Sequence, residues 1–172
     1  YDCTPISDGA AAAVLCAADL AAEFTDRPID VIGSGHAMGP ATLFEMADLT
    51  TFEASVAAAQ QAYREADLAP RDIDVAEVHD CFTIAEITAI EDLGFVQKGK
   101  GGPAVADGLT ALDGKLPINP SGGLLSKGHP VGATGLAQIY EIVGQLRGEA
   151  INQVKGAQIG LAHNLGGTGA VS

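Results

Sequence analysis

The most distinctive part of this chain is residues 119–135, which read Asn-Pro-Ser-Gly-Gly-Leu-Leu-Ser-Lys-Gly-His-Pro-Val-Gly-Ala-Thr-Gly. Glycine and proline are abundant in it, and this composition predicts turns around a single histidine, His129. Pro130 suits the first position of a helix, because its missing N–H would have no partner there. Apolar residues then recur at helical spacing up to Gly148, so we expect a helix directly after His129.

The overall composition limits what the chain can be. Of its 172 residues, 47% are hydrophobic and 18% charged, which supports one folded domain or one repeat of a larger duplicated fold. The net charge of −13 argues against nucleic acid or an anionic membrane as a partner, since both require a basic surface. No apolar run is long enough for a membrane span, and the apolar run at 9–18 lacks the preceding basic segment of a signal peptide. Three cysteines cannot all pair, which favours a reducing compartment, and we expect a cytoplasmic protein.

Strand and helix patterns alternate along the chain. Short apolar runs predict strands at residues 10–18, 29–33 and 157–162, although the alanine content of 10–18 would also allow a helix. Alternating apolar and acidic residues predict a further strand at 73–78. Capping boxes, Thr50 with Glu53 and Thr83 with Glu86, predict the starts of two helices. Residues 97–115 are expected to form a long surface excursion. Strands that alternate with helices imply an α/β fold, in which helices cover both faces of a mixed or parallel sheet.

Three of the four histidines lie where a predicted strand or loop ends and the chain turns. They are His79, His129 and His163. Ligands of α/β proteins bind at this edge of the sheet. A single histidine at such a position is more often a capping or solvated residue, but three together favour a shared functional site.

The motifs around these histidines resemble those of the thiolase superfamily. Residues 119–135 resemble its Gly-His-Pro signature. The segment His79-Asp-Cys-Phe82 resembles the motif that sterol-carrier-protein-type and archaeal thiolases carry where other thiolases have Asn-Glu-Ala-Phe. His163-Asn-Leu-Gly-Gly resembles the C-terminal loop of the same subgroup, and residues 7–12 resemble the closing strand of a thiolase N-terminal half. The resemblance covers essentially the whole chain. It indicates the C-terminal half of a protein of the sterol-carrier-protein-type or archaeal acetyl-CoA acetyltransferase-like subgroup.

This resemblance implies the thiolase-like fold, in which each half of an αβαβα sandwich has a mixed five-stranded sheet with helices on both faces. Residues 1–28 would be the tail of the N-terminal half, and residues 29–172 the C-terminal domain. The implied activity belongs to lipid metabolism: Claisen condensation of acyl-CoA, or thiolysis of 3-oxoacyl-CoA. The coenzyme A thioester is the substrate, and neither a cofactor nor a metal is expected. The implied partners are acyl-CoA or coenzyme A, the N-terminal half, and further copies in a homodimer or homotetramer.

The resemblance also assigns catalytic roles. His129 matches the histidine that activates the nucleophilic cysteine and helps to hold the thioester oxygen, and a helix N-terminus would keep it neutral, as a base requires. His79 replaces an asparagine that positions an oxyanion-hole water, which an imidazole N–H could also do. Cys81 is assigned proton transfer at the substrate α-carbon, with its thiol pKa lowered by the helix that follows. His163 could donate to an oxyanion, orient Cys81 or only fill space.

Four further residues are expected to contact the substrate. His36 and Met38 lie in a Gly-rich loop that could border the acyl pocket, and Gly128 precedes the catalytic histidine. Leu165 stands where the family has glycine, in the region of the second oxyanion hole. We interpret as structural the other residues of interest, namely Asp80, Asn119, Phe82, Cys3 and Cys16.

The nucleophilic cysteine of thiolases belongs to the N-terminal half, and neither Cys3 nor Cys16 has its surrounding motif. Because the first residue is not Met, we expect a fragment that lacks its N-terminal part and is inactive alone. Two alternatives stay open: another condensing enzyme of this fold, such as a ketoacyl synthase or hydroxymethylglutaryl-CoA synthase, and a non-catalytic scaffold subunit. Cys81 argues for a thiolase over the first alternative. The presence of both His129 and Cys81 argues against the second.

Overall fold

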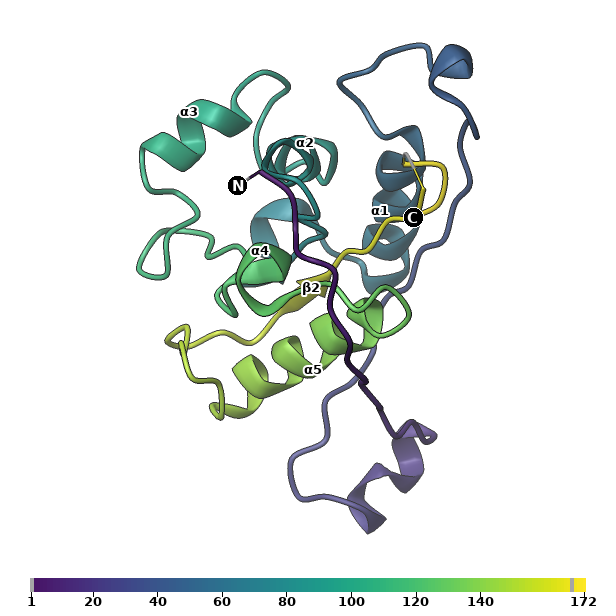
Figure 1. The fold of residues 1–172 in the computed structure, drawn as a ribbon. Helices are drawn as coiled ribbons and strands as arrows, with labels where there is room; N and C mark the ends of the chain where they lie inside the picture. The colour runs from purple at the N-terminus through teal and green to yellow at the C-terminus, as the bar shows by residue number, and fades with distance from the viewer. Residues whose placement is uncertain (1, 168) are drawn as a thin grey trace.

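The computed structural model describes residues 2–167 and 169–172, and Figure 1 shows a mixed chain of helices, short strands and long loops. In chain order the elements are η1 (Ala18–Glu23), η2 (Leu43–Glu45), α1 (Glu53–Ala66), η3 (Pro70–Asp72), β1 (Val75–Glu77), α2 (Thr83–Asp92), α3 (Gly101–Ala106), α4 (Gly123–Lys127), α5 (Thr134–Arg147) and β2 (Gly160–Ala162). Helix α3 lies within the expected surface excursion at 97–115. Among the described residues, no helix combines the length and the apolar character needed to cross a bilayer.

A small parallel sheet lies at the centre of the fold. β1 and β2 pair in parallel, with Glu77 opposite Ala162. On the other side of β1, Ile118 forms a parallel bridge with Ala76, so residues 117–119 extend the sheet by one edge. The connections between these three segments contain α2 to α5, because parallel neighbours need long crossovers.

Helices cover both faces of this sheet, as expected (Figure 1). Ala76 and Val78 belong to the larger core cluster, together with Ile90 of α2. Val75 packs on the opposite side, against Ile142 of α5. Successive residues of a strand point to opposite faces, so one short strand anchors both helical layers. Full burial of a large apolar side chain contributes about 1.5–3 kcal/mol, which makes these contacts the main source of stability.

Two of the expected strands are absent from the part of the chain that the structure describes. Residues 10–17 and 29–33 have no strand assignment, and no backbone hydrogen bond joins them to another segment. Val14 and Val31 in these segments are 92% and 74% exposed. An apolar run becomes a strand only where a neighbour supplies hydrogen-bond partners. The mixed α/β architecture is therefore confirmed, with a smaller sheet than the five strands expected.

The two capping boxes do not form. Helix α1 begins at Glu53, and the Thr50 hydroxyl bonds an aspartate upstream of the helix. Helix α2 does begin at Thr83, but Glu86 Oε2 accepts a hydrogen bond from Asn119 Nδ2 at 2.9 Å. In each box, one of the two side chains bonds another partner, namely Thr50 in the first and Glu86 in the second.

The helix after the Gly-His-Pro motif also begins later than expected. The Pro130 carbonyl accepts hydrogen bonds from the N–H groups of Ala133 (2.8 Å) and Thr134 (3.0 Å), which makes a turn over these residues. Helix α5 starts only at Thr134. His129 therefore does not lie at a helix N-terminus, and the dipole argument for its neutral form does not hold.

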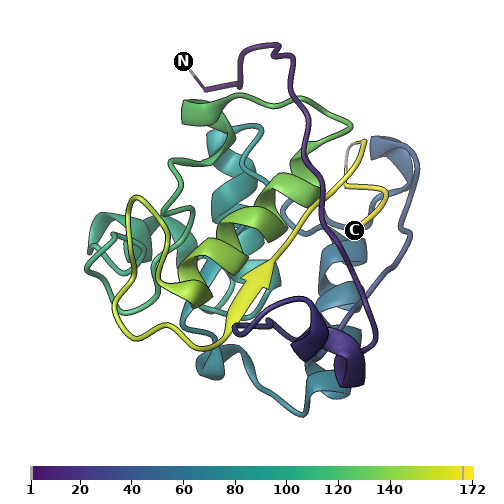
Figure 2. The ribbon, with the colours of Figure 1, turned by 90° about the horizontal axis from the view of Figure 1, so that it is seen from below.

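An extended arm, residues 2–9, runs along the surface past α4 and α5 (Figures 1 and 2). Cys3 pairs with Phe82, and Ile6 pairs with His129, each as an isolated bridge. Residues three positions apart span at most about 11 Å of extended chain. The loops that contain Phe82 and His129 thus attach to neighbouring points of one arm.

Residues 33–39 lie along α1 and then reach the C-terminus. A Cβ atom at Gly35 would collide with the carbonyl oxygen of Ala58, so glycine is needed for this close approach. Met38 pairs in antiparallel fashion with Val171. This segment therefore belongs to the α1 side of the molecule.

Candidate active site

The two strands bring two of the three histidines to one edge of the sheet. His79 lies two residues after β1, and His163 directly follows β2. His163 N donates a hydrogen bond to Glu77 O at 2.8 Å, so the parallel ladder continues to this point. The two histidines are 4% and 5% exposed. Both imidazoles are therefore held in the interior by the carboxyl ends of neighbouring strands.

His129 meets this edge from the loop before α5. The ring centroids of His79 and His129 are 4.9 Å apart, with an interplanar angle of 84°, which is an edge-to-face contact. His163 is close enough to His79 for that neighbour to affect its pKa. Residues that are far apart in the sequence thus form one histidine cluster, which comprises His79, His129 and His163.

Burial keeps two members of the cluster uncharged. It lowers the pKa of His79 to about 4, and His129 acts in the same direction. Burial also lowers the pKa of His163 to about 4, with a further contribution from His79. At neutral pH each of these rings has one N–H donor and one acceptor nitrogen. The cluster can therefore both donate and accept hydrogen bonds.

Helix α1 holds His163 through a hydroxyl group. His163 Nε2 lies 2.9 Å from Ser55 Oγ, and Ser55 is fully buried. Within the described residues, the Nδ1 atoms of His79 and His163 are buried and have no hydrogen-bond partner. An unpaired buried polar atom costs about 1–3 kcal/mol. These two nitrogens are consequently the atoms that a bound polar group would satisfy.

Two further residues hold His129 from either side. Ser7 Oγ, from the arm, accepts a hydrogen bond from His129 N at 3.3 Å. His129 Nδ1 lies 2.6 Å from Thr134 Oγ1 in the first turn of α5. Gly128 has a φ of 87°, and a side chain there would collide with the Ser7 hydroxyl. Neither Ser7 nor Thr134 was predicted as a site residue, although Thr134 lies within residues 119–135.

Cys81 lies two residues after His79, in the loop before α2. Burial is the largest influence on its thiol, and it raises the pKa. The charge of Asp80 acts in the same direction, while backbone N–H groups oppose both. The expected lowering of this pKa is therefore wrong. At neutral pH the thiol is protonated, which makes it a proton donor rather than a thiolate.

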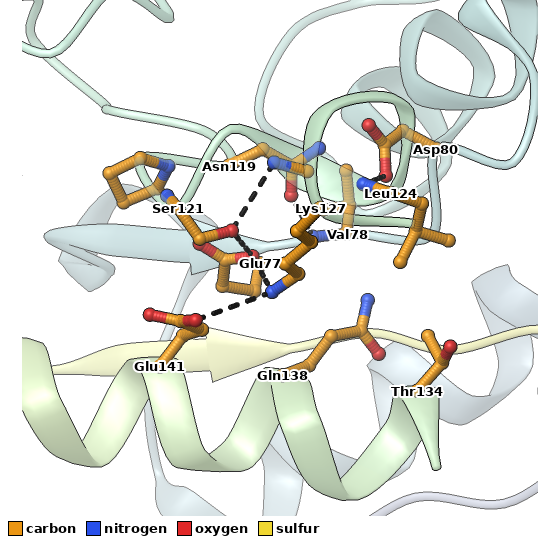
Figure 3. Close-up of polar contacts among 12 residues, drawn as sticks. Glu77, Val78, Asp80, Asn119, Ser121, Leu124, Lys127, Thr134, Gln138 and Glu141 are labelled. Atoms are coloured by element: carbon orange, nitrogen blue, oxygen red, sulfur yellow. Dashed lines mark hydrogen bonds and ion pairs between the residues drawn. The ribbon is translucent and has the colours of Figure 1, made fainter. Parts of the chain in front are cut away.

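A buried carboxylate supports the loop before His129. Glu77 is 1% exposed and accepts hydrogen bonds from Ser121 N (3.1 Å) and Ser121 Oγ (2.7 Å). Lys127 Nζ lies 3.6 Å from carboxylate oxygens of both Glu77 and Glu141, and Figure 3 shows it between the sheet and α5. Burial raises the pKa of Glu77, while Ser121 and Lys127 lower it. Because a buried charge needs partners, this network positions Lys127 two residues before His129.

Asp80 and Asn119 have structural roles, as expected. Asp80 Oδ1 accepts a hydrogen bond from a backbone N–H in the first turn of α4 at 2.8 Å. Asn119 Oδ1 accepts one from Val78 N at 2.8 Å and so continues the edge of β1 beyond its end. Gln138 of α5 donates to the carbonyl of His163 at 2.9 Å. Gln138 was not predicted as a site residue, because a glutamine within a helix carries no signal of its distant partner.

The residues expected to contact the substrate lie in different places. Gly128 is buried beside the arm, and Leu165 is buried after β2, with 6% exposure. His36 and Met38 are exposed. His36 Nδ1 lies 3.0 Å from Ser172 O, so the contacts of the Gly-rich loop are with α1 and the C-terminus. Gly128 is thus the member of this group that adjoins the histidine cluster.

Three residues that we interpret as structural are exposed. Phe82 is 53% exposed, so about half of its surface is not packed against other residues. Cys3 and Cys16 are also exposed, and all three cysteines are free thiols. Cys81 is the most buried of the three thiols.

Comparisons with known proteins agree with the motifs. The family described as "Thiolase C-terminal domain-like" matches residues 35–172. An acetyl-CoA acetyltransferase of Methanothermobacter thermautotrophicus is 58% identical over 169 residues, which cover 98% of this chain and 44% of that protein. Sterol carrier protein 2 of Oryctolagus cuniculus is 44% identical over 174 residues, which cover 98% of this chain and 32% of that protein. The chain therefore spans less than half the length of these relatives.

The fold is also similar to that of a solved structure. The Ltp2–ChsH2(DUF35) aldolase matches with a TM-score of 0.70 and 29% sequence identity. The match covers 76% of this chain and 34% of that chain. The histidine cluster thus lies on a fold with known relatives.

Proposed function

The chain belongs to the family of thiolase C-terminal domains, and we propose that it forms the C-terminal half of a coenzyme A-dependent acyltransferase. The proposed reaction is the Claisen condensation of acyl-CoA, or its reverse, the thiolysis of a 3-oxoacyl-CoA by coenzyme A. The observation that carries the proposal is the 4.9 Å contact between the rings of His79 and His129. Acyl transfer needs a base and hydrogen-bond donors around one small reacting group.

In this proposal each proton transfer is carried out by a different residue of the site. His129 takes the proton of the nucleophilic cysteine and later assists the release of the acyl group. When the bond between C2 and C3 of the substrate breaks, Cys81 donates a proton to the C2 carbanion and acetyl-CoA leaves. The raised thiol pKa supports this direction, because the protonated thiol is the form at neutral pH. The neutral rings of His79 and His163 supply donors for oxyanions, and their unpaired Nδ1 atoms support that role.

The nucleophile and much of the binding surface are proposed to come from an N-terminal thiolase half. In this division, residues 1–28 are the tail of that half and residues 29–172 form the C-terminal domain. Large apolar side chains are exposed in the first part of the described chain, among them Val14, Phe24 and Phe44. Extensive exposed apolar surface marks a site of interaction, which supports a partner there. We further propose a homodimer or homotetramer, a cytoplasmic location, and no cofactor beyond the coenzyme A thioester.

The test is the conversion of acetoacetyl-CoA and coenzyme A to acetyl-CoA. We expect no detectable thiolysis by this chain alone, and activity when it is assembled with the N-terminal half. His129→Ala or Cys81→Ala should each lower kcat about 100-fold or more, since general acid–base groups contribute about 10²–10⁴-fold. Cys16→Ala is the matched control, because Cys16 is an exposed thiol outside the site. Wild-type rates in both site variants would exclude the catalytic roles assigned to His129 and Cys81.

A second candidate is carbon–carbon cleavage without a covalent thioester. The similar solved structure, Ltp2–ChsH2(DUF35), is that of an aldolase. Aldol cleavage needs a base and an oxyanion donor but no nucleophilic thiol, and a cluster of neutral imidazoles could supply both. Trapping of an acyl group on a cysteine of the N-terminal half would support the thiolase. Turnover of a 3-hydroxyacyl-CoA with no such intermediate would support the aldolase.

A further inference from the structure

We propose that Thr134 is a positioning residue that keeps the ring proton of neutral His129 on Nδ1, so that Nε2 carries the free lone pair. This inference rests on the proposed function, in which His129 acts as a base. It adds what the motif does not state, namely which ring nitrogen is available for proton transfer.

Two distances define the contact. Thr134 Oγ1 lies 2.6 Å from His129 Nδ1 and 3.2 Å from the carbonyl oxygen of Pro130. Thr134 is 1% exposed, so water does not compete for its hydroxyl group. Figure 3 shows Thr134 in the first turn of α5, on the side that faces the sheet. The hydroxyl therefore bridges the histidine ring and the turn that follows it.

A hydroxyl group has one proton, and this decides between two arrangements. In the first, His129 Nδ1–H donates to Thr134 Oγ1, and the hydroxyl proton goes to the Pro130 carbonyl. Each proton then has an acceptor, and both contacts are hydrogen bonds. In the second, the hydroxyl donates to Nδ1, and the two oxygen atoms face each other at 3.2 Å with no proton between them. The first arrangement makes one more hydrogen bond, so we assign the Nδ1–H tautomer.

The surroundings of the ring agree with this assignment. A threonine hydroxyl in a helix commonly donates to the carbonyl four residues earlier, which for Thr134 is that of Pro130. Ser7 holds the backbone N–H of His129 rather than its ring. Nδ1 is therefore the ring nitrogen with a built partner, and Nε2 is left for the reaction.

The first experiment does not depend on activity. In the chain labelled with ¹⁵N-histidine, long-range ¹H–¹⁵N spectra at pH 9 distinguish the two neutral tautomers, and loss of a signal in His129→Gln assigns the ring. We expect the proton on Nδ1 in the wild type and in Thr134→Ser, which keeps the hydroxyl. In Thr134→Val, which has the same shape but no hydroxyl, we expect a mixture of tautomers. An Nε2–H form in the wild type, or an unchanged tautomer in Thr134→Val, would overturn the assignment.

The second experiment measures thiolysis in the assembled enzyme. In metal sites, loss of a group that orients a ligating histidine costs about 10- to 100-fold in affinity or activity, and we expect a comparable factor for a reacting histidine. We expect Thr134→Val to lower kcat by that factor with little change in KM, and Thr134→Ser to restore the rate. Thr88→Val is the matched control, since the buried Thr88 hydroxyl also bonds a carbonyl four residues earlier but contacts no histidine. If Thr134→Val lowers kcat no more than Thr88→Val, the positioning role is wrong.

The two experiments separate the inference from the proposed function. Absence of thiolysis in the wild-type assembly would refute the function but leave the tautomer measurement valid. A wrong tautomer in an active wild type would refute the inference alone.

Discussion

The first and the later parts of this chain are built in different ways. Among described residues, positions 2–53 contain no buried side chain, whereas every buried apolar residue lies between Ala54 and Leu165. The later part is held by its core. The arm at residues 2–9 is attached by backbone pairing and by the hydroxyl of Ser7. A segment can thus contribute to a site without contributing to the core that supports it.

The histidines of the site are also held in two different ways. His79 and His163 are set by strands within the core, and burial decides their charge. His129 is held from the arm by the Ser7 hydroxyl and the bridge with Ile6, and from α5 by Thr134. Changes in the core should therefore affect stability, while changes in the arm should affect the local order of the His129 loop.

The largest expected effect is the loss of stability when a buried side chain of the core is shortened. Ile90 is 0% exposed, and Ile90→Ala should lower the free energy of unfolding by about 2–5 kcal/mol, because it removes buried contacts and leaves a cavity. Ile6 in the arm is fully exposed, so Ile6→Ala should change that free energy by less than about 0.5 kcal/mol. Urea denaturation measures both. Equal losses of unfolding free energy in the two variants would contradict the distinction between arm and core.

The next effect is a dependence of stability on pH that arises in the core. The pKa of His163 falls from 6.5 to about 4 on folding, so the unfolded chain binds a proton that the folded chain excludes. Stability from this residue is fully present above pH 6.5 and is lost as the pH falls toward 4. At about 1.4 kcal/mol per pKa unit, the loss is roughly 3 kcal/mol.

A variant isolates this contribution from other titrating groups. The raised pKa values of Glu77, Asp80 and Glu86 change stability in the opposite sense as the pH falls toward their normal values. In His163→Gln, the slope of unfolding free energy against pH between 6.5 and 4 should decrease by about one proton. A slope identical to that of the wild type would show that His163 is not buried in its neutral form.

The smallest effect tests the attachment of the arm. Ser7→Ala removes the acceptor of the His129 N–H, and a single hydrogen bond contributes about 0.5–1.5 kcal/mol. We expect faster hydrogen exchange at the His129 amide and little change in the urea midpoint. Ser34→Ala is the control, because the backbone of Ser34, rather than its hydroxyl, bonds α1. Unchanged exchange at His129 in Ser7→Ala would mean that the Ser7 hydroxyl does not hold this loop.

Local sequence patterns correctly predicted several elements in the later part of the chain, where the core lies. The strand near residue 75, the helix starting at Thr83 and the turns around His129 all follow from spacing and from Gly and Pro positions. The expected strands at 10–18 and 29–33 are wrong in the described structure, because an apolar run does not specify its own pairing partner. The late start of α5 is a similar case, since the turn after Pro130 competes with the helix.

The imidazole and thiol groups that the chain offers, and their places at the ends of elements, follow from the sequence alone, because residue identity and periodicity are local properties. Only the tertiary structure decided their chemical state and their partners. It raised the pKa of Cys81, kept His79 and His163 neutral, and placed Ser7 and Thr134 on either side of His129. Desolvation and hydrogen bonding depend on groups that come from distant parts of the chain, and these meet only when the chain has folded.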